Sequence, residues 1–160
     1  MTVTNKKIDE WLNMPKKVTK SPKKELVSRQ GSLRNDFECE STDGNEKFRV
    51  FIRILEALQE DFSIGLDYID KQGKSFCLIR CNGKHGLHRN HQPGAIPFDG
   101  FHIHLATEGA INNGESPEQF AEPTKEYTTW QDALSHFVKM THIHDADKYF
   151  PFLRQPNLFS

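Results

Sequence analysis

The sequence lacks long hydrophobic runs and has little cysteine. No apolar stretch approaches the roughly 20 residues that a membrane-spanning helix needs, and the opening residues MTVTNKKIDEW lack the apolar segment of a secretion signal. The three cysteines, Cys39, Cys77 and Cys81, form no disulfide framework. These absences argue against a membrane-spanning protein and against a disulfide-stabilised secreted domain. We expect a cytoplasmic protein with reduced thiols.

Two of the cysteines lie close together in the sequence. Cys77 and Cys81 flank Leu-Ile-Arg in a predicted strand. Four residues of strand separate their Cα atoms by about 13 Å, which is too far for a disulfide or for sharing one zinc ion. Both are expected to be small buried hydrophobic residues.

An excess of charge of one sign is also missing, although the charge is unevenly distributed. The formal net charge is −1, yet residues 1–30 hold seven lysines and one arginine against three acidic residues. The basic stretch NMPKKVTKSPKKELVSR contacts nucleic-acid phosphates, forms a solvated arm or docks on the acidic remainder, and solvation is the commonest fate of such runs. We divide the chain into a basic N-terminal helix and linker, residues 1–30, and a single domain, residues 31–160.

A short helix is predicted near the N-terminus. Thr4 can cap it, and Ile8, Trp11 and Leu12 share one face. Pro15 ends it.

Alternating apolar and polar residues then predict two β-hairpins. The first covers residues 33–54 and turns at Asp43-Gly44, and the second turns at residues 70–74, DKQGK. Residues 55–61, LEALQED, extend a strand or form a helical turn. A long loop follows at 82–99, and GFHIHLA is a fifth strand with its histidines facing away from the core.

An amphipathic helix closes the predicted domain. Thr128 and Gln131 match a capping box, and an apolar stripe begins at Trp130 and continues to Phe137. The aromatic tail after it is expected to fold back on the body. The predicted fold class is α+β: an antiparallel β-sheet of about five strands, a short N-terminal helix, and a C-terminal amphipathic helix packed on one face.

His-Ile-His occurs twice. On a strand, side chains i and i+2 lie on one face, roughly 7 Å apart, so His102 and His104 can converge on one metal ion or one phosphate. On a helix such side chains diverge. His142 and His144 fall at or just beyond the end of the predicted helix, where the helix dipole favours histidine, so we interpret this second copy as structural.

Five of the eight histidines gather within residues 85–104. RNA cleavage by attack of the 2′-hydroxyl needs an acid and a base with pKa near 7, and two histidines supply both. We predict that His102 and His104 are this pair, that His88 assists them and that Arg89 holds the phosphate. The further substrate-binding candidates are Arg80, Lys84, Asn90 and Glu108.

Two other interpretations stay open beside this cofactor-free one. Three imidazoles, from His102, His104 and His88, would leave a fourth position open on zinc, as catalytic zinc sites do. A non-catalytic binding module of a toxin–antitoxin or regulatory system would instead use the basic N-terminal segment to hold a partner.

The second half of the chain also resembles known proteins. The pattern LIRCNGKHGLHRN…FHIHLATEG…WQDALSHFVKM, within residues 62–143, resembles a group of small bacterial proteins of unassigned function. It is more distantly similar to the TumE-type toxins of toxin–antitoxin systems. That likeness implies a metal-independent endoribonuclease-like toxin or defence-associated protein, with RNA or a cognate antitoxin-like protein as partner. The matching positions are His88, Arg89, Asn90, His102, His104 and Glu108.

Overall fold

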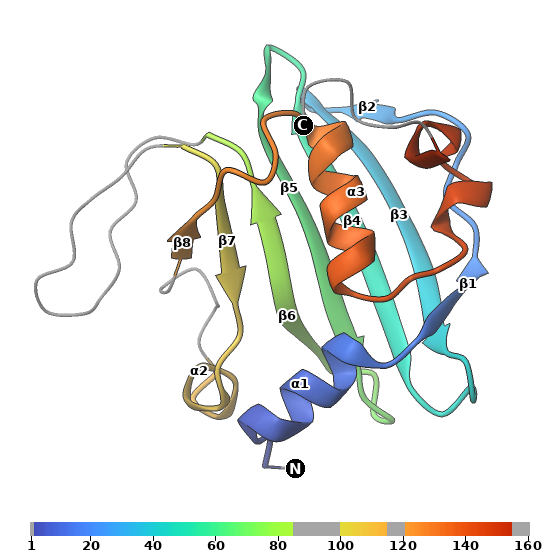
Figure 1. The fold of residues 1–160 in the computed structure, drawn as a ribbon, viewed down its shortest axis with the longest axis vertical. Helices are drawn as coiled ribbons and strands as arrows, with labels where there is room; N and C mark the ends of the chain where they lie inside the picture. The colour runs from blue at the N-terminus through green and yellow to red at the C-terminus, as the bar shows by residue number, and fades with distance from the viewer. Residues whose placement is uncertain (1, 85–99, 115–120, 155–160) are drawn as a thin grey trace, which may run out of the picture.

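The computed structural model describes residues 2–84, 100–114 and 121–154 (Figure 1). Eight strands form one sheet in the order β1-β3-β4-β5-β6-β7-β8, and β2 also pairs with β3. All of these strand pairs are antiparallel. The strands are β1 (Lys16–Lys20), β2 (Val27–Arg29), β3 (Ser32–Ser41), β4 (Lys47–Leu55), β5 (Leu58–Ile69), β6 (Ser75–Asn82), β7 (His102–Leu105) and β8 (Ala121–Pro123).

Within the described residues, three α-helices and two short 3-10 helices accompany the sheet. The α-helices are α1 (Asn5–Asn13), α2 (Glu108–Asn112) and α3 (Trp130–Met140), and the 3-10 helices are η2 (Ala146–Lys148) and η3 (Pro151–Arg154). The α+β class is confirmed, but the predicted strand number of about five is too small. Among the described residues, no helix has the length and apolar character needed to cross a membrane.

The additional strands are short and mostly polar, which explains why periodicity missed them. β1, with the sequence KKVTK, has a single apolar residue, Val18. It exists because it pairs with β3 on one side, while on the other side Asp145 accepts a hydrogen bond from the Val18 amide. β2 and β8 have three residues each. Tertiary pairing, rather than local propensity, determines such strands.

Both predicted hairpins are confirmed, with one correction between them. Gly44 adopts a φ of 79° in the β3–β4 turn and Gly73 a φ of 84° in the β5–β6 turn, where a side chain would be strained. Between these hairpins, β4 ends at Leu55 and β5 begins at Leu58. The prediction that LEALQED extends a strand or forms a helical turn is therefore wrong, because the chain reverses within it.

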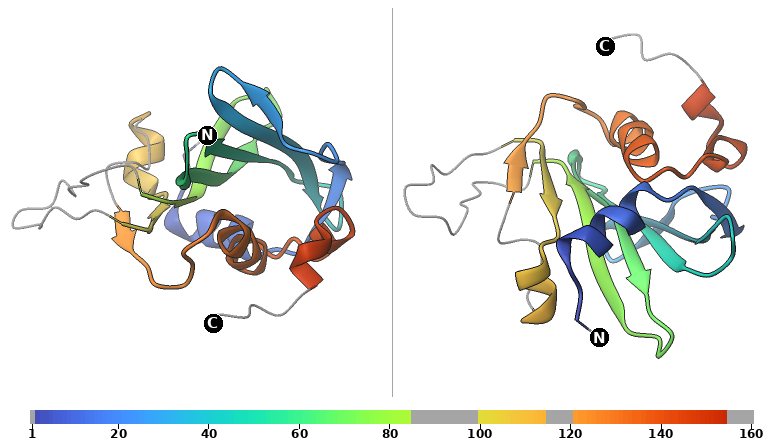
Figure 2. Two further views of the ribbon diagram at one scale, coloured as in Figure 1. Left: turned by 90° about the horizontal axis from the view of Figure 1, so that it is seen from above. Right: turned by 60° about the horizontal axis from the view of Figure 1, so that its bottom comes forward.

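The hydrophobic core lies between the sheet and the layer formed by α1 and α3, which Figures 1 and 2 show on one side of the sheet. Trp11 of α1 stacks on Tyr68 of β5 with ring centroids 3.9 Å apart. The tail folds back as predicted, since buried Phe150 packs on Phe37.

The predicted caps are right for one helix and displaced by one residue for the other. The Thr4 side chain accepts a hydrogen bond from the Lys7 amide at the start of α1, as predicted. The N-cap of α3 is Thr129, whose side chain accepts from the Asp132 amide, and not Thr128. Adjacent threonines made this boundary ambiguous in the sequence.

A β-bulge in β6 places its two cysteines on opposite faces. Leu66 pairs with Ile79 and the next residue, Asp67, pairs with Cys77, so β6 carries one extra residue at this point. Cys81 is buried on the core side, as predicted, whereas Cys77 is half-buried beside Asp67 on the other side. The bulge also gives Arg80 the same orientation as Cys77.

Candidate functional site

The sheet face opposite α1 and α3 carries two adjacent rows of side chains that run across five strands. Paired residues of antiparallel strands project to the same side, so each row follows directly from the register. We call these ten residues the polar face. The first row is Arg34, Arg53, Ser63, Asn82 and His102, and the second is Asp36, Phe51, Gly65, Arg80 and His104.

β7 brings His102 and His104 together, as its alternation predicted. Their ring centroids are 4.9 Å apart and their planes are inclined by 76°. Each residue is only 2% exposed. Leu105 pairs with Ile79 in the row that contains buried Leu66, yet it is 38% exposed. The two histidines are thus more deeply buried than Leu105 beside them.

The hydrogen bonds of His102 fix its tautomer. Nδ1 lies 2.8 Å from the carbonyl oxygen of Gly100, and a carbonyl can only accept, so Nδ1 carries the proton. Nε2 lies 3.4 Å from Nδ2 of Asn82, which is placed to donate to it. With Nδ1 bonded to this carbonyl, Nε2 is the ring nitrogen placed to act as a general base.

The backbone beneath this pair is held by Tyr127. Tyr127 lies in the loop leading into α3. Its hydroxyl lies 3.0 Å from the carbonyl oxygen of Asn82 and 2.7 Å from that of His102. Burial raises the pKa of the Tyr127 phenol far above its ordinary range, so it stays a donor. Tyr127 was not predicted as a site residue, and its position far along the chain gave no sequence signal.

Arg80 and Lys84 reach this region, but by different routes. Arg80 pairs directly with His104 across β6 and β7. Lys84 follows β6 near the start of β7, where its Nζ lies 3.8 Å from a carboxylate oxygen of Glu60 and 5.6 Å from the centroid of the Phe101 ring. Of the predicted substrate-binding residues that the structure describes, Arg80 shares a row with a histidine.

Glu108 lies at the other end of β7, at the start of α2. Its carboxylate accepts a hydrogen bond from the Asn5 amide at 2.8 Å, and its own amide donates to Oδ1 of Asn5 at 2.9 Å. This reciprocal pair joins α1 to α2, and the structure does not bring Glu108 to Lys84. His88, Arg89 and Asn90, the loop residues of the predicted site, lie outside the described residues.

The zinc interpretation needs a third ligand in addition to the strand pair. Within residues 2–84, 100–114 and 121–154, no group of three or more histidine, cysteine, aspartate or glutamate side chains is arranged to hold a metal ion. The predicted third ligand, His88, lies outside these ranges.

The second His-Ile-His lies in the turn that follows α3 rather than in the helix. α3 ends at Met140, and His142 has a φ of 59°. The rings of His142 and His144 are 5.8 Å apart. Burial, followed by the nearby charge of Lys16, lowers the pKa of His142. The position of His142 directly after the C-terminal end of α3 agrees with a structural role for this residue.

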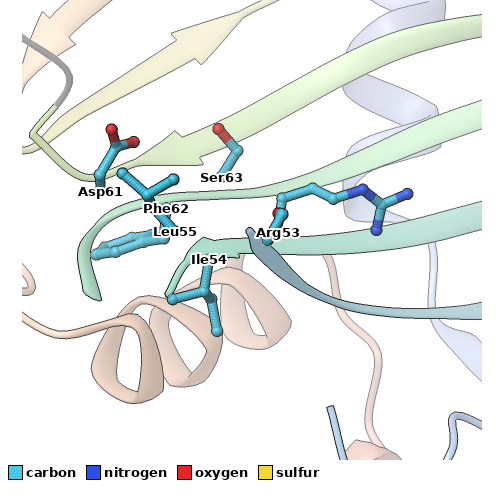
Figure 3. Close-up of a pocket in the computed structure, with 7 residues that line it drawn as sticks. Arg53, Ile54, Leu55, Asp61, Phe62 and Ser63 are labelled. Carbon is cyan, nitrogen blue, oxygen red and sulfur yellow. The ribbon is translucent and has the colours of Figure 1, made fainter. Parts of the chain in front are cut away.

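A small open pocket lies at one end of the polar face, where β4 turns into β5. It encloses about 140 Å³. In Figure 3, Ser63 and Asp61 project from one side of β5 while Ile54 projects toward the helix on the other side. Its lining residues are Ser32, Arg53, Ile54, Leu55, Asp61, Phe62 and Ser63.

Comparison with known proteins agrees with the first of the two resemblances. Residues 3–143 match the sequence model of a family described as "Family of unknown function (DUF6978)". The chain belongs to this family. The matched residues run from before α1 to the first residues after α3 and contain all of the polar face. No curated protein and no solved structure matches the chain. The likeness to TumE-type toxins remains a prediction.

Proposed function

We propose that the protein binds the phosphate backbone of RNA on its polar face. The observation that carries this proposal is the direct pairing of Arg34 with Arg53 across β3 and β4. Like charges directly opposite each other destabilise a sheet. Two paired guanidinium groups are favourable when an anion lies between or above them, and arginine is well suited to bidentate contact with phosphate.

The two arginines differ in their partners, which leaves positive charge in the row. Arg53 donates to both carboxylate oxygens of Asp36, at 2.5 and 3.2 Å. Arg34 is half-buried, and within the part of the chain that the structure describes its buried Nε has no hydrogen-bond partner. Asp36 thus neutralises one of the two arginines. Arg34 is the residue that we assign to phosphate.

Polar side chains continue the same rows toward the other end of the face, where Asn82 and His102 are each only 2% exposed. Arg80 adds a third guanidinium, and Asn82 and His102 continue the first row. Oδ1 of Asn82 is buried and, within the described residues, accepts no hydrogen bond. The distant likeness to RNA-cleaving toxins is a separate reason to choose RNA as the phosphate-bearing partner.

RNA cleavage is the second function to test, and the tautomer of His102 favours it. Against it, both rings of the pair are 2% exposed and contact each other, which leaves no space between them for a phosphate in this conformation. Binding is therefore the function that the geometry supports better, and metal-independent cleavage stays a prediction.

Binding is tested with a fluorescein-labelled RNA dodecamer and fluorescence anisotropy. Arg34→Gln is expected to weaken binding by roughly tenfold and to reduce the dependence of affinity on salt by about one phosphate contact. Arg154→Gln is the matched control, because Arg154 lies on η3 and is paired with Asp147. No binding by the wild type at low salt, or equal effects of the two substitutions, would overturn the proposal.

Cleavage is tested on the same RNA in excess EDTA, with gel readout. If the second function holds, the wild type cleaves and His102→Gln and His104→Gln do not, while both variants keep cooperative thermal unfolding. Intact RNA with the wild type, or cleavage that survives both substitutions, would refute a His-dependent nuclease. If cleavage depends on a metal ion, RNA stays intact in EDTA and is cleaved when zinc or manganese is added in excess of the chelator.

A further inference from the structure

An aromatic ring lies flat on the middle of the polar face. Phe51 of β4 is paired directly with Gly65 of β5. A Cβ atom added to Gly65 would lie 2.1, 2.5 and 2.9 Å from three atoms of the Phe51 ring, Cζ, Cε1 and Cε2. These contacts mean that the ring occupies the space of a missing side chain and rests against the backbone of β5. A side chain at position 65 would push it away.

The surroundings of Phe51 are charged rather than apolar. The ring is half-buried, and it lies in the row between Asp36 and Arg80. The guanidinium carbon of Arg53 is 5.9 Å from the ring centroid. The glycine backbone therefore covers one side of the ring, and the ring has Asp36 as its direct partner on β3 and the Arg53 guanidinium nearby, on a side of the sheet that α1 and α3 do not cover.

We infer that Phe51 is a stacking platform for a base of single-stranded RNA, an inference that rests on the proposed function. A ring fixed on a sheet between arginines can bind a base on its free face while the arginines bind the phosphates on either side. The bases of a duplex are already stacked on both faces, so they cannot use it. The aromatic platform thus selects single strands.

The simpler explanation is that Phe51 merely shields the glycine backbone, as aromatic residues do in many sheets. The two explanations differ in what they require of the side chain. Shielding needs apolar volume, which leucine also supplies. Stacking needs a flat π-system, which leucine lacks and tryptophan keeps.

The experiment compares Phe51→Leu and Phe51→Trp in binding to a labelled single-stranded RNA and to the same strand annealed to its complement. Phe51→Leu is expected to weaken single-strand binding about tenfold or more, with duplex binding unchanged, and Phe51→Trp is expected to retain wild-type affinity. Phe76→Leu is the matched control, because Phe76 is also half-buried with a cation over its ring, from Lys74 at 5.3 Å, but pairs with Tyr68 on the core side.

The outcomes separate this inference from the proposed function. Wild-type affinity in Phe51→Leu, together with weakened binding in Arg34→Gln, overturns the stacking role and leaves phosphate binding intact. Tighter binding of duplex than of single strand also overturns it. A readout that does not depend on Phe51→Leu folding is the fluorescence of Phe51→Trp, corrected for Trp11 and Trp130 with the wild type. We expect RNA to quench it, and unchanged fluorescence at saturating RNA contradicts stacking.

Discussion

Lys16 keeps its ammonium group inside the protein, where it joins the ends of two helices. It is 1% exposed, and Nζ donates to the carbonyl oxygens of Leu12 at 3.1 Å, Met14 at 3.0 Å and Thr141 at 2.6 Å. The last carbonyls of a helix have no partner within the helix and attract positive charge. One side chain therefore satisfies the C-terminal ends of α1 and α3 together.

Replacing Lys16 by methionine is expected to lower the free energy of unfolding by about 2–4 kcal/mol, because three carbonyls, of which that of Thr141 is fully buried, lose a charged donor while the apolar volume is kept. Urea denaturation at neutral pH measures this. Lys17→Met is the control, since Lys17 is exposed, and its effect should stay within about 0.5 kcal/mol. Equal values for the two variants would contradict the role assigned to Lys16.

The buried state of Lys16 could not be predicted from its neighbours in the sequence. It belongs to a basic run, and such runs are usually solvated. Its acceptor Thr141 lies 125 residues away, so the pattern near residue 16 gives no sign of the contact. The same holds for Arg34, whose partner across the sheet is known only once the register of β3 and β4 is fixed.

The end of α3 is built around a residue in the left-handed conformation. After Thr141, His142 has a φ of 59°, and the amide of buried Ile143 donates back to the carbonyl of Val138 at 3.1 Å. This is a Schellman arrangement, in which glycine is usual at the position of His142. Histidine there carries strain that a glycine would avoid.

His142→Gly is expected to raise the free energy of unfolding by about 0.5–1 kcal/mol, because the left-handed conformation costs glycine little. His142→Ala removes the same ring but keeps the strain, so it should not stabilise the protein. Thermal unfolding of the two variants side by side isolates the backbone effect. A loss of stability in His142→Gly would show that the imidazole itself holds the end of the helix.

The elements that periodicity could predict are those whose signals are local. α1, α3, the two hairpins and β7 each have a cap, a turn glycine or an alternation of their own. β1, β2 and β8 have three to five residues and depend on the strands beside them. For the candidate site, the sequence placed His102 and His104 on one strand, but the opposing arginines needed the sheet register.

Across the whole molecule, buried thiols set the response to alkaline pH. Burial raises the pKa of Cys39, Cys77 and Cys81 to about 12 each, from about 9. Above pH 9 the unfolded chain therefore releases protons that the native chain keeps, and each thiol lowers the free energy of unfolding by about 1.4 kcal/mol per pH unit. Burial lowers the pKa of Lys16 to about 8, so Lys16 acts in the opposite sense up to about pH 10.5.

The expected sum is a free energy of unfolding that falls by roughly 2 kcal/mol per pH unit between pH 9 and 10, below the range in which Tyr68 and Tyr127 also contribute. Urea denaturation at several pH values measures the slope. Cys39→Ala should make the slope shallower by the contribution of one thiol, which is about 1.4 kcal/mol per pH unit at most. Lys16→Met should make the slope steeper, because Lys16 opposes the thiols. A stability that is independent of pH in this range would show that the thiols are accessible to water in the native state.

From β3 to β8 the sheet is a meander, in which each strand pairs with the next one along the chain. Such a sheet can grow during synthesis, one hairpin at a time, as the ribosome releases it. β1 follows a different schedule, because the Val18 amide bonds to Asp145, 127 residues later. β1 can pair with β3 early, but its other edge stays open until residue 145 emerges, so the segment made first is completed by one of the last to be made.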